Sequence, residues 1–177
     1  MREGLSDVLT SARKLRVGDD ATCSLNPPLP DAEWLEAKAR LETHVQSLHP
    51  DQVTLWRHCD GGDFFGLSIV GAHEADALWN DDGPEHKAIS FHNWGNGDFT
   101  YLVHAGDPVY PEGSVIGSNH EGGRCTAQIA PSLAEWFRRA IDETERHGSV
   151  FHQWDYQEPG MNKVKGLYRP LYEKFKD

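Results

Sequence analysis

The sequence contains few cysteines and no long apolar segment, and each scarcity limits what the protein can be. Its 177 residues include three cysteines, an odd number without a CxxC pair, which argues against a disulfide framework and favours a reducing compartment. A run of about eighteen apolar residues, enough to cross a bilayer, is absent, and so is the apolar core of a signal peptide. We therefore expect a cytoplasmic protein.

Basic charge is also scarce, since 17 Lys and Arg residues face 28 Asp and Glu residues, for a net charge of −11. Residues 1–16 and 148–177 carry +2 and +1, which leaves −14 for residues 17–147. Phosphate backbones and anionic lipid surfaces would repel this acidic body, so neither nucleic acid nor a membrane is an expected partner. The charge favours a basic protein partner, although acidity also serves solubility alone.

Apolar spacing predicts helices over residues 5–16, 31–48 and 133–147, with further helical turns around residues 53–56. Asp31 is the predicted N-cap of the second helix, which follows a proline-rich loop over residues 18–30. Ser132 and Glu135 form a capping-box signature before the last helix. With 38% hydrophobic residues, the chain can bury one sizeable core and is expected to form a single domain.

Short runs rich in β-branched and aromatic residues, separated by glycine and asparagine turns, predict strands over residues 64–70, 88–92, 99–104, 114–118 and 124–129. The sequence NWGNGD joins the second and third of these runs and is typical of a hairpin connection. Beyond residue 147 the chain is rich in aromatic residues but is broken by proline and glycine, so no long regular element is expected there.

Ten histidines raise the question of a metal site. The set most consistent with one is His92, His104 and His120 with Asp98, near predicted strand ends and turns. Each histidine stands alone, without the helical pair of HExxH, so no metal and no cofactor is predicted. A nucleophilic role for Cys59 beside His58 lacks an activating context, and the glycine pairs lack the form of a phosphate-binding loop.

Three pieces of the sequence follow one another in a characteristic order: LWRHCDGG, NWGNGD before a core strand, and IAPSLAEWF at the start of the last helix. In this order they resemble the SUKH superfamily, particularly its Smi/Knr-like branch, and the resemblance covers residues 31–147. It implies an α+β fold with a mixed, mainly antiparallel sheet of about five or six strands flanked by helices. The expected organisation is one domain over residues 1–147 and an aromatic extension, 148–177, that packs on it.

Because many bacterial members of that superfamily are immunity proteins, the resemblance implies a non-enzymatic domain that binds and neutralises a cognate toxin, such as a basic nuclease. The chain would be a monomer or a weak homodimer. Exposed acidic groups and two tryptophans are the expected partner contacts: Asp60, Asp63, Glu74, Asp76, Trp79, Asp81, Asp82, Glu85, Trp94 and Asp98.

Two other functions stay open. A metal-dependent hydrolase would use His92, Asp98, His104 and His120 and would bind metal when purified. A regulatory adaptor would bind an endogenous protein instead of a toxin, and only the identity of the partner separates it from an immunity protein.

Overall fold

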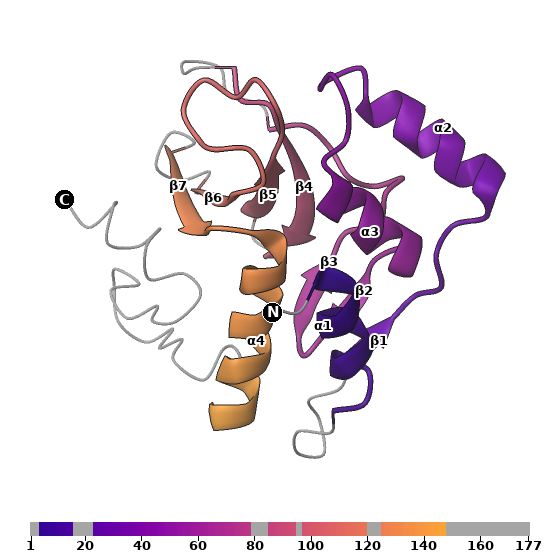
Figure 1. The fold of residues 1–177 in the computed structure, drawn as a ribbon, viewed down its shortest axis with the longest axis vertical. Coiled ribbons are helices and arrows are strands. Elements are labelled where there is room, and N and C mark those ends of the chain that lie inside the picture. Colours follow the sequence, from indigo (N-terminus) through magenta and orange to yellow (C-terminus); the bar gives the residue numbers. More distant parts are fainter. Residues whose placement is uncertain (1–3, 16–22, 79–84, 95–96, 120–124, 148–177) are drawn as a thin grey trace.

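The computed structural model describes residues 4–15, 23–78, 85–94, 97–119 and 125–147, which fold into four helices and seven strands (Figure 1). The helices are α1 (Leu5–Ala12), α2 (Asp31–Leu41), α3 (Pro50–His58) and α4 (Leu133–His147). The strands are β1 (Cys23–Leu25), β2 (Gly62–Phe64), β3 (Leu67–Ile69), β4 (Ala88–Asn93), β5 (Phe99–Val103), β6 (Val115–Asn119) and β7 (Cys125–Ala130). Within these ranges no helix is long and apolar enough to span a membrane. The predicted extension over residues 148–177 lies outside them.

The seven strands form one open sheet in which each strand pairs with its neighbours in the sequence, in the order β1 to β7. Every pairing is antiparallel. The α+β class is therefore confirmed, but the expectation of a mixed sheet with five or six strands is wrong. Antiparallel neighbours can be joined by short connections. The longer connection between β3 and β4 also joins two antiparallel strands.

The sequence missed β1, which lies inside the predicted loop over residues 18–30. Its three residues pair with β2, Cys23 opposite Phe64 and Leu25 opposite Gly62. A Cβ on Gly62 would lie 2.6 Å from the carbonyl oxygen of Ser24, and its φ of +116° also suits glycine. β1 is thus held by close contact between its backbone and that of β2. The neighbouring prolines do not prevent this pairing, because proline is tolerated at the edge of a sheet.

The predicted strand over residues 64–70 is instead a hairpin, β2 and β3. Its two-residue turn places Phe65 at φ 55° and Gly66 at φ 91°, the positive values of a tight hairpin turn. The Asp63 carboxylate accepts the Gly66 N–H at 3.0 Å. The turn was hidden in the sequence because Phe64, Phe65 and Leu67 are all buried, so the single Gly66 between them did not interrupt the predicted strand.

The predicted last helix is confirmed as α4, and the Ser132 hydroxyl accepts the Glu135 N–H at 3.2 Å, as the capping signature predicts. The predicted first helix is present as α1, but it ends at Ala12 and not at residue 16. The second helix is shorter than predicted, ending at Leu41, and it begins with Pro30 at the N-cap, so the assignment of Asp31 to that position is wrong. The apolar spacing continued to Leu48 because non-helical residues after Leu41 also bury their side chains.

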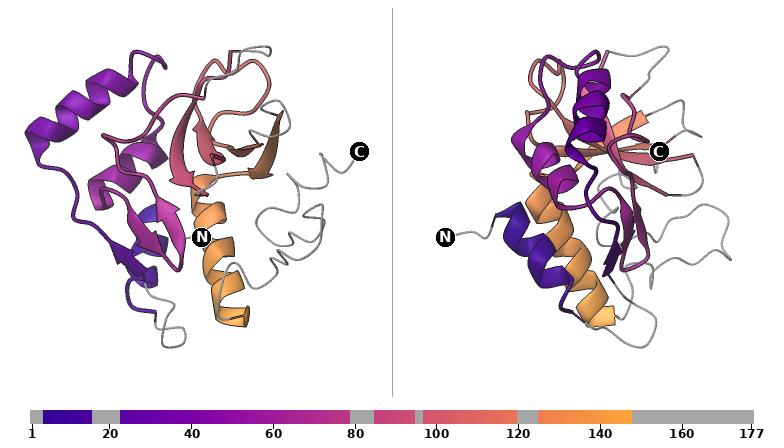
Figure 2. Two further views of the ribbon diagram at one scale, coloured as in Figure 1. Left: turned by 180° about the vertical axis from the view of Figure 1, so that it is seen from behind. Right: turned by 90° about the vertical axis from the view of Figure 1, so that its right-hand side faces the viewer.

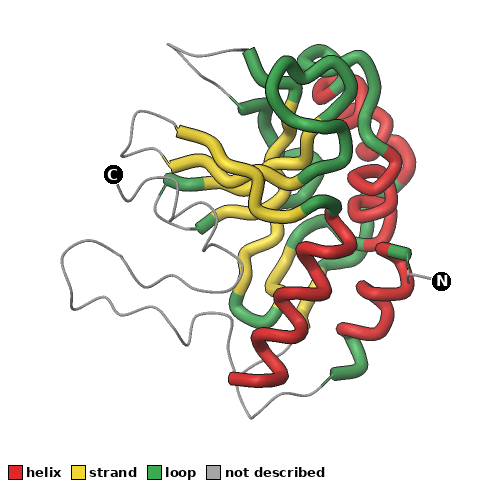
Figure 3. The backbone as a smooth tube through the Cα atoms, turned by 60° about the vertical axis from the view of Figure 1, so that its left-hand side comes forward, coloured by secondary structure: helices red, strands yellow, loops and turns green. Residues whose placement is uncertain are grey.

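Helices α1, α3 and α4 lie together on one face of the sheet (Figure 3). Between these layers, Phe91 of β4 meets Trp136 edge-on at 5.1 Å, and Phe64 of β2 meets Phe137 at 4.8 Å. All four rings are fully buried. Each such side chain removed from water contributes about 2–3 kcal/mol, so these contacts fix α4 against the sheet.

The other face of the sheet has a smaller apolar cluster, formed by Leu78, Ala88, Tyr101, Val103 and Ile116. The 104–114 loop folds over part of it, and the Tyr110 hydroxyl donates to the Thr126 carbonyl at 2.9 Å. The buried Asp107 side chain organises this loop because its carboxylate accepts the backbone N–H groups of Lys87, Val109 and Tyr110 at 2.8 to 2.9 Å.

Helix α2 stands at the edge of the molecule, at the end opposite to α4 (Figures 1 and 2). Its buried residues, Trp34, Ala37 and Leu41, face the body, and Trp34 contacts the Trp56 ring of α3 with a centroid separation of 6.4 Å. The opposite side of α2 is exposed to solvent and includes Leu35, which is 62% exposed.

Candidate functional site

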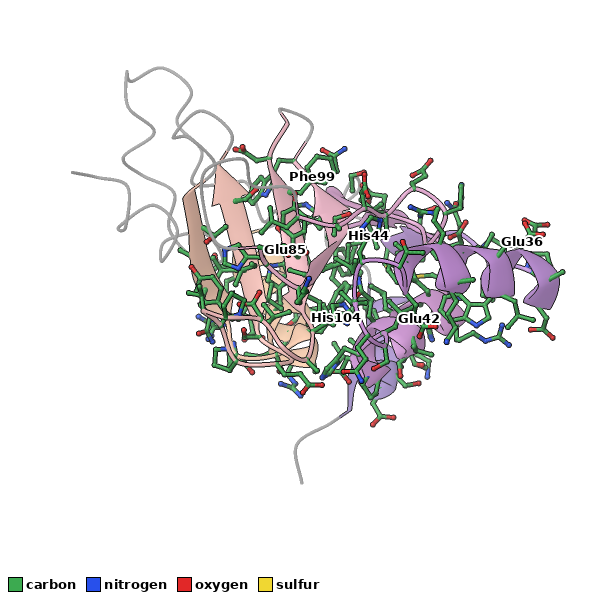
Figure 4. The ribbon with its side chains drawn as sticks, turned by 90° about the horizontal axis from the view of Figure 1, so that it is seen from above. Glu36, Glu42, His44, Glu85, Phe99 and His104 are labelled. Atoms are coloured by element: carbon green, nitrogen blue, oxygen red, sulfur yellow. The ribbon has the colours of Figure 1, made fainter. Side chains whose placement is uncertain are left out.

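A groove of about 330 Å³ lies between α2, the segment that precedes it and the 71–76 turn. Six side chains line it: Leu29, Glu33, Glu36, Ala37, Arg40 and His73. The α2 members recur at spacings of three and four residues, so they share one face of the helix. Figure 4 shows Glu36 on the outer side of α2, away from the sheet.

Arg40 fixes the distance between α2 and the 71–76 turn. Its Nη2 nitrogen lies within hydrogen-bond distance of three backbone carbonyls, those of Ala72 at 3.0 Å, His73 at 3.1 Å and Ala75 at 2.8 Å, so its two N–H groups are shared among three acceptors. Hydrogen bonds from a charged donor are stronger than neutral ones, and the planar guanidinium can serve several acceptors at once. These hydrogen bonds hold α2 against the 71–76 turn, so the two sides of the groove cannot separate without breaking them.

Asp60 supports the turn from behind. One carboxylate oxygen accepts the Ala72 N–H at 2.9 Å, and the other lies 3.0 Å from Nδ1 of His73. A Cβ on Gly71 would come within 2.5 Å of the same carboxylate, so the position has no room for a side chain. The Asp60 side chain is only 11% exposed. It positions the wall of the groove and presents little of its charge to a partner.

The free negative charge of the groove comes from Glu33 and Glu36, whose side chains are exposed. Neither carboxylate has an ion-pair or hydrogen-bond partner among the described residues. Glu74, 68% exposed, extends this charge along the turn, and its carboxylate lies 4.0 Å from Nε2 of His73. Leu29 and Ala37 supply an apolar floor beneath the carboxylates. Such a groove can hold a cationic group that has an aliphatic stem.

The predicted partner-contact residues do not form one surface. Asp60 and Glu74 flank the groove, whereas Asp63 belongs to the β2–β3 turn. Asp76 accepts the N–H of Ala77, and its own N–H donates to the Ser90 hydroxyl at 2.9 Å. Predicted contacts Trp79, Asp81 and Asp82 lie outside the described residues.

The remaining predicted contacts lie on the β4–β5 hairpin and at its start. Glu85 is exposed and pairs with Lys87 at 2.6 Å. Trp94 is half-buried, with its ring 5.0 Å from the ring of His92, and its backbone N–H donates to the Asp98 carbonyl at 3.1 Å. This contact closes the β4–β5 hairpin, in agreement with the prediction that NWGNGD is a hairpin connection.

Sequence reasoning missed Glu33 and Glu36, although a signal for them existed. Both lie on α2 away from the apolar positions that begin with Trp34, where a helical projection would have placed two acidic groups one turn apart. Nothing in the sequence indicates that the 71–76 turn lies opposite this face, because that depends on the contacts of Arg40.

The histidines of the hydrolase hypothesis do not share a site. The N–H of His104 donates to the Lys87 carbonyl just before β4, whereas His92 lies near the end of that strand. The separation along the strand is roughly 16 Å. His120 lies outside the described residues, and the described ones contain no group of three or more His, Cys, Asp and Glu that could hold a metal. His92 and His104, which the hydrolase hypothesis would bring together with Asp98, are therefore too far apart to share one metal ion.

Both of these histidines are buried in the interior. Nδ1 of His92 lies 3.0 Å from the Thr100 hydroxyl, and burial lowers the pKa of His92 to about 3. His104 lies between the sheet and the start of α3 (Figure 4), where it accepts the His49 N–H at 2.9 Å, and burial lowers its pKa to about 4. Both imidazoles are neutral at physiological pH.

The cysteines offer no activated nucleophile in the described part of the chain. Cys23 and Cys59 are free thiols. Burial raises the pKa of Cys23 to about 11 and that of Cys59 to about 12. Since the thiolate is the reactive form, both groups are inert at neutral pH. Burial also lowers the pKa of the neighbouring His58.

Comparison with known proteins gives no family assignment: no family model matches the chain, and no curated protein matches it.

Proposed function

We propose that this protein is a non-enzymatic binding domain that recognises a basic protein through the groove between α2 and the 71–76 turn. The observation that carries the proposal is the pair of unpaired carboxylates, Glu33 and Glu36, above the apolar floor of Leu29 and Ala37. The net charge of −11 supports it, because a strong negative field speeds the encounter with a cationic partner.

The biological role we propose is that of an immunity protein, which acts in the cytoplasm by binding a toxin domain and covering its active site. Two observations support this role: the resemblance of residues 31–147 to the SUKH superfamily, and the acidic body formed by residues 17–147. Toxins that cleave nucleic acids carry basic surfaces for the phosphate backbone. An acidic groove competes for such a surface directly, so inhibition needs no chemistry on the toxin.

The test is co-expression of the full chain with the toxin domain encoded beside it, scored by survival, followed by size-exclusion chromatography of the mixed purified proteins. Protection together with a stoichiometric complex is the expected result. The association rate should fall steeply with added salt, while dissociation changes less. Survival without the immunity gene, or protection without any complex, would refute the proposal, and a complex with an endogenous protein alone would favour an adaptor.

A further inference from the structure

Glu33 and Glu36 differ from the other charged side chains of α2 in having no partner among the described residues. The others are engaged, in these pairings: Asp31 with Arg57 at 2.8 Å, Lys38 with Glu42 at 2.6 Å, and Arg40 with three carbonyls. The hydrogen bond from Lys38 also lowers the pKa of Glu42. The unpaired charge of α2 is therefore confined to the side chains that line the groove.

The size and lining of the groove limit what can occupy it. A volume of about 330 Å³ is at the lower end for pockets that hold small molecules, so one long side chain fits better than a folded segment. Leu29 and Ala37 favour an aliphatic stem, and two carboxylates one helical turn apart favour a cationic head with several N–H groups. Arginine meets both conditions, because its planar guanidinium has five N–H donors and is weakly hydrated.

The cation already in the groove does not prevent this. The Arg40 guanidinium points at the carbonyls of the 71–75 segment. Its Cα lies about 6 Å along α2 from that of Glu36 and about 10 Å from that of Glu33, the latter close to one Debye length at physiological salt. His73 contacts the Asp60 carboxylate at 3.0 Å, so that acid offsets any charge it acquires. The Glu33 end of the groove keeps its negative potential.

We propose that the groove is an anchor site for one arginine side chain of the protein partner, with Glu33 and Glu36 binding the guanidinium and Arg40 acting as a positioning residue. The proposal rests on the function proposed above and adds to it the identity of the side chain recognised. Lysine would bind more weakly, because its single ammonium cannot serve two carboxylates in a planar arrangement.

The first experiment uses the ¹⁵N-labelled full chain and the peptide acetyl-Gly-Arg-Gly-amide, followed by NMR. The comparison peptides replace arginine with lysine or with citrulline, which has the same shape without the charge. We expect saturable shifts at the amides of residues 33–37 with a Kd of about 1 mM, a Kd several-fold higher with lysine, and no saturation with citrulline. Equal shifts for arginine and lysine, or shifts outside residues 29–40 and 71–76, would overturn the proposal.

A matched pair of double variants separates the site from general electrostatics. E33Q/E36Q removes the two groove charges, and D142N/E145Q removes two exposed charges from α4, at the opposite end of the molecule. The first is expected to weaken arginine-peptide binding roughly tenfold, the second less than twofold. Similar losses in both variants would mean that only net charge matters. Thermal melting of each variant verifies that it remains folded.

Repeating the comparison with the toxin domain distinguishes this inference from the proposed function. If the toxin binds the wild-type chain and E33Q/E36Q equally well, the arginine site is refuted while the binding function stands. If the arginine peptide saturates the groove but no toxin complex and no protection occur, the binding function is refuted while the arginine site stands. Loss of toxin binding in E33Q/E36Q but not in D142N/E145Q supports both.

Discussion

Acidification between pH 7 and pH 5 should destabilise the fold through His104, a residue that is 1% exposed. Its Nδ1 accepts the His49 N–H at 2.9 Å and lies 3.2 Å from the Ser47 carbonyl oxygen, and its Nε2 lies 2.6 Å from the side-chain oxygen of Gln52, to which it donates its proton. Gln52 in turn donates to the carbonyls of Ile89 and Ser90. The neutral ring with hydrogen on Nε2 thus joins α3 to the sheet, and this assignment follows from the bonding partners.

The magnitude follows from the pKa of His104, which burial lowers from 6.5 to about 4. Because the folded state binds the proton less readily than the unfolded chain, the contribution of His104 to stability is complete above pH 6.5 and is lost as the pH falls from 6.5 toward 4. The loss is about 1.4 kcal/mol per pH unit in this window. At pH 5 it amounts to about 2 kcal/mol, a large share of the stability of a small domain.

The assay is urea unfolding followed by tryptophan fluorescence at pH 7 and pH 5, for the wild type, His104→Asn and the exposed control His44→Asn. Asparagine can still accept the His49 N–H but leaves Gln52 without its donor, so a loss of about 1–3 kcal/mol at pH 7 is expected. The decisive quantity is the further loss between pH 7 and pH 5, which should be smaller by about 2 kcal/mol in His104→Asn than in the wild type or the control. An equal loss in all three proteins would refute the reasoning.

Three further predictions concern the fold. Trp56→Phe removes an indole N–H that donates to a buried carbonyl at 3.0 Å, so urea unfolding should show a loss of about 1–3 kcal/mol. Gly62→Ala would place a Cβ 2.6 Å from the Ser24 carbonyl and should abolish hydrogen-exchange protection in β1, whereas Gly106→Ala, with a positive φ but nothing within 4 Å, should leave β1 protected. Asp107→Ala leaves three backbone N–H groups without their acceptor, and calorimetry should show a loss of about 2–4 kcal/mol.

The sequence predicted elements well where a periodic pattern was long. The 133–147 helix shows its apolar stripe over four turns, and Ser132 and Glu135 indicated its N-terminal cap. The predictions of short elements failed for physical reasons. β1 has three residues and exists through pairing with β2, a contact between distant parts of the chain. The 64–70 hairpin failed because its turn contains Phe65, a residue that favours strands and is rare at positive φ.

The candidate site was less accessible from the sequence than the fold. Acidic character could be read from the charge count, and Glu74 was identified as an acidic side chain expected to be exposed. Asp60 was identified for the same reason, but its carboxylate is engaged with the Ala72 N–H and His73. Composition cannot distinguish an aspartate that organises a turn from one that faces a partner, because both occur in polar, glycine-rich segments.

The histidines and aspartates, which are the residue types that could suggest a catalytic or metal site, instead stabilise the fold. His92 and His104 are neutral and buried, and Asp107 accepts backbone N–H groups inside a loop. Buried polar groups need partners, and a group so engaged cannot bind a ligand without a loss of stability. A charged side chain without a partner in the fold is therefore a better guide to a binding site than residue type. In helix α2 that criterion selects Glu33 and Glu36, the carboxylates above the apolar floor of the groove.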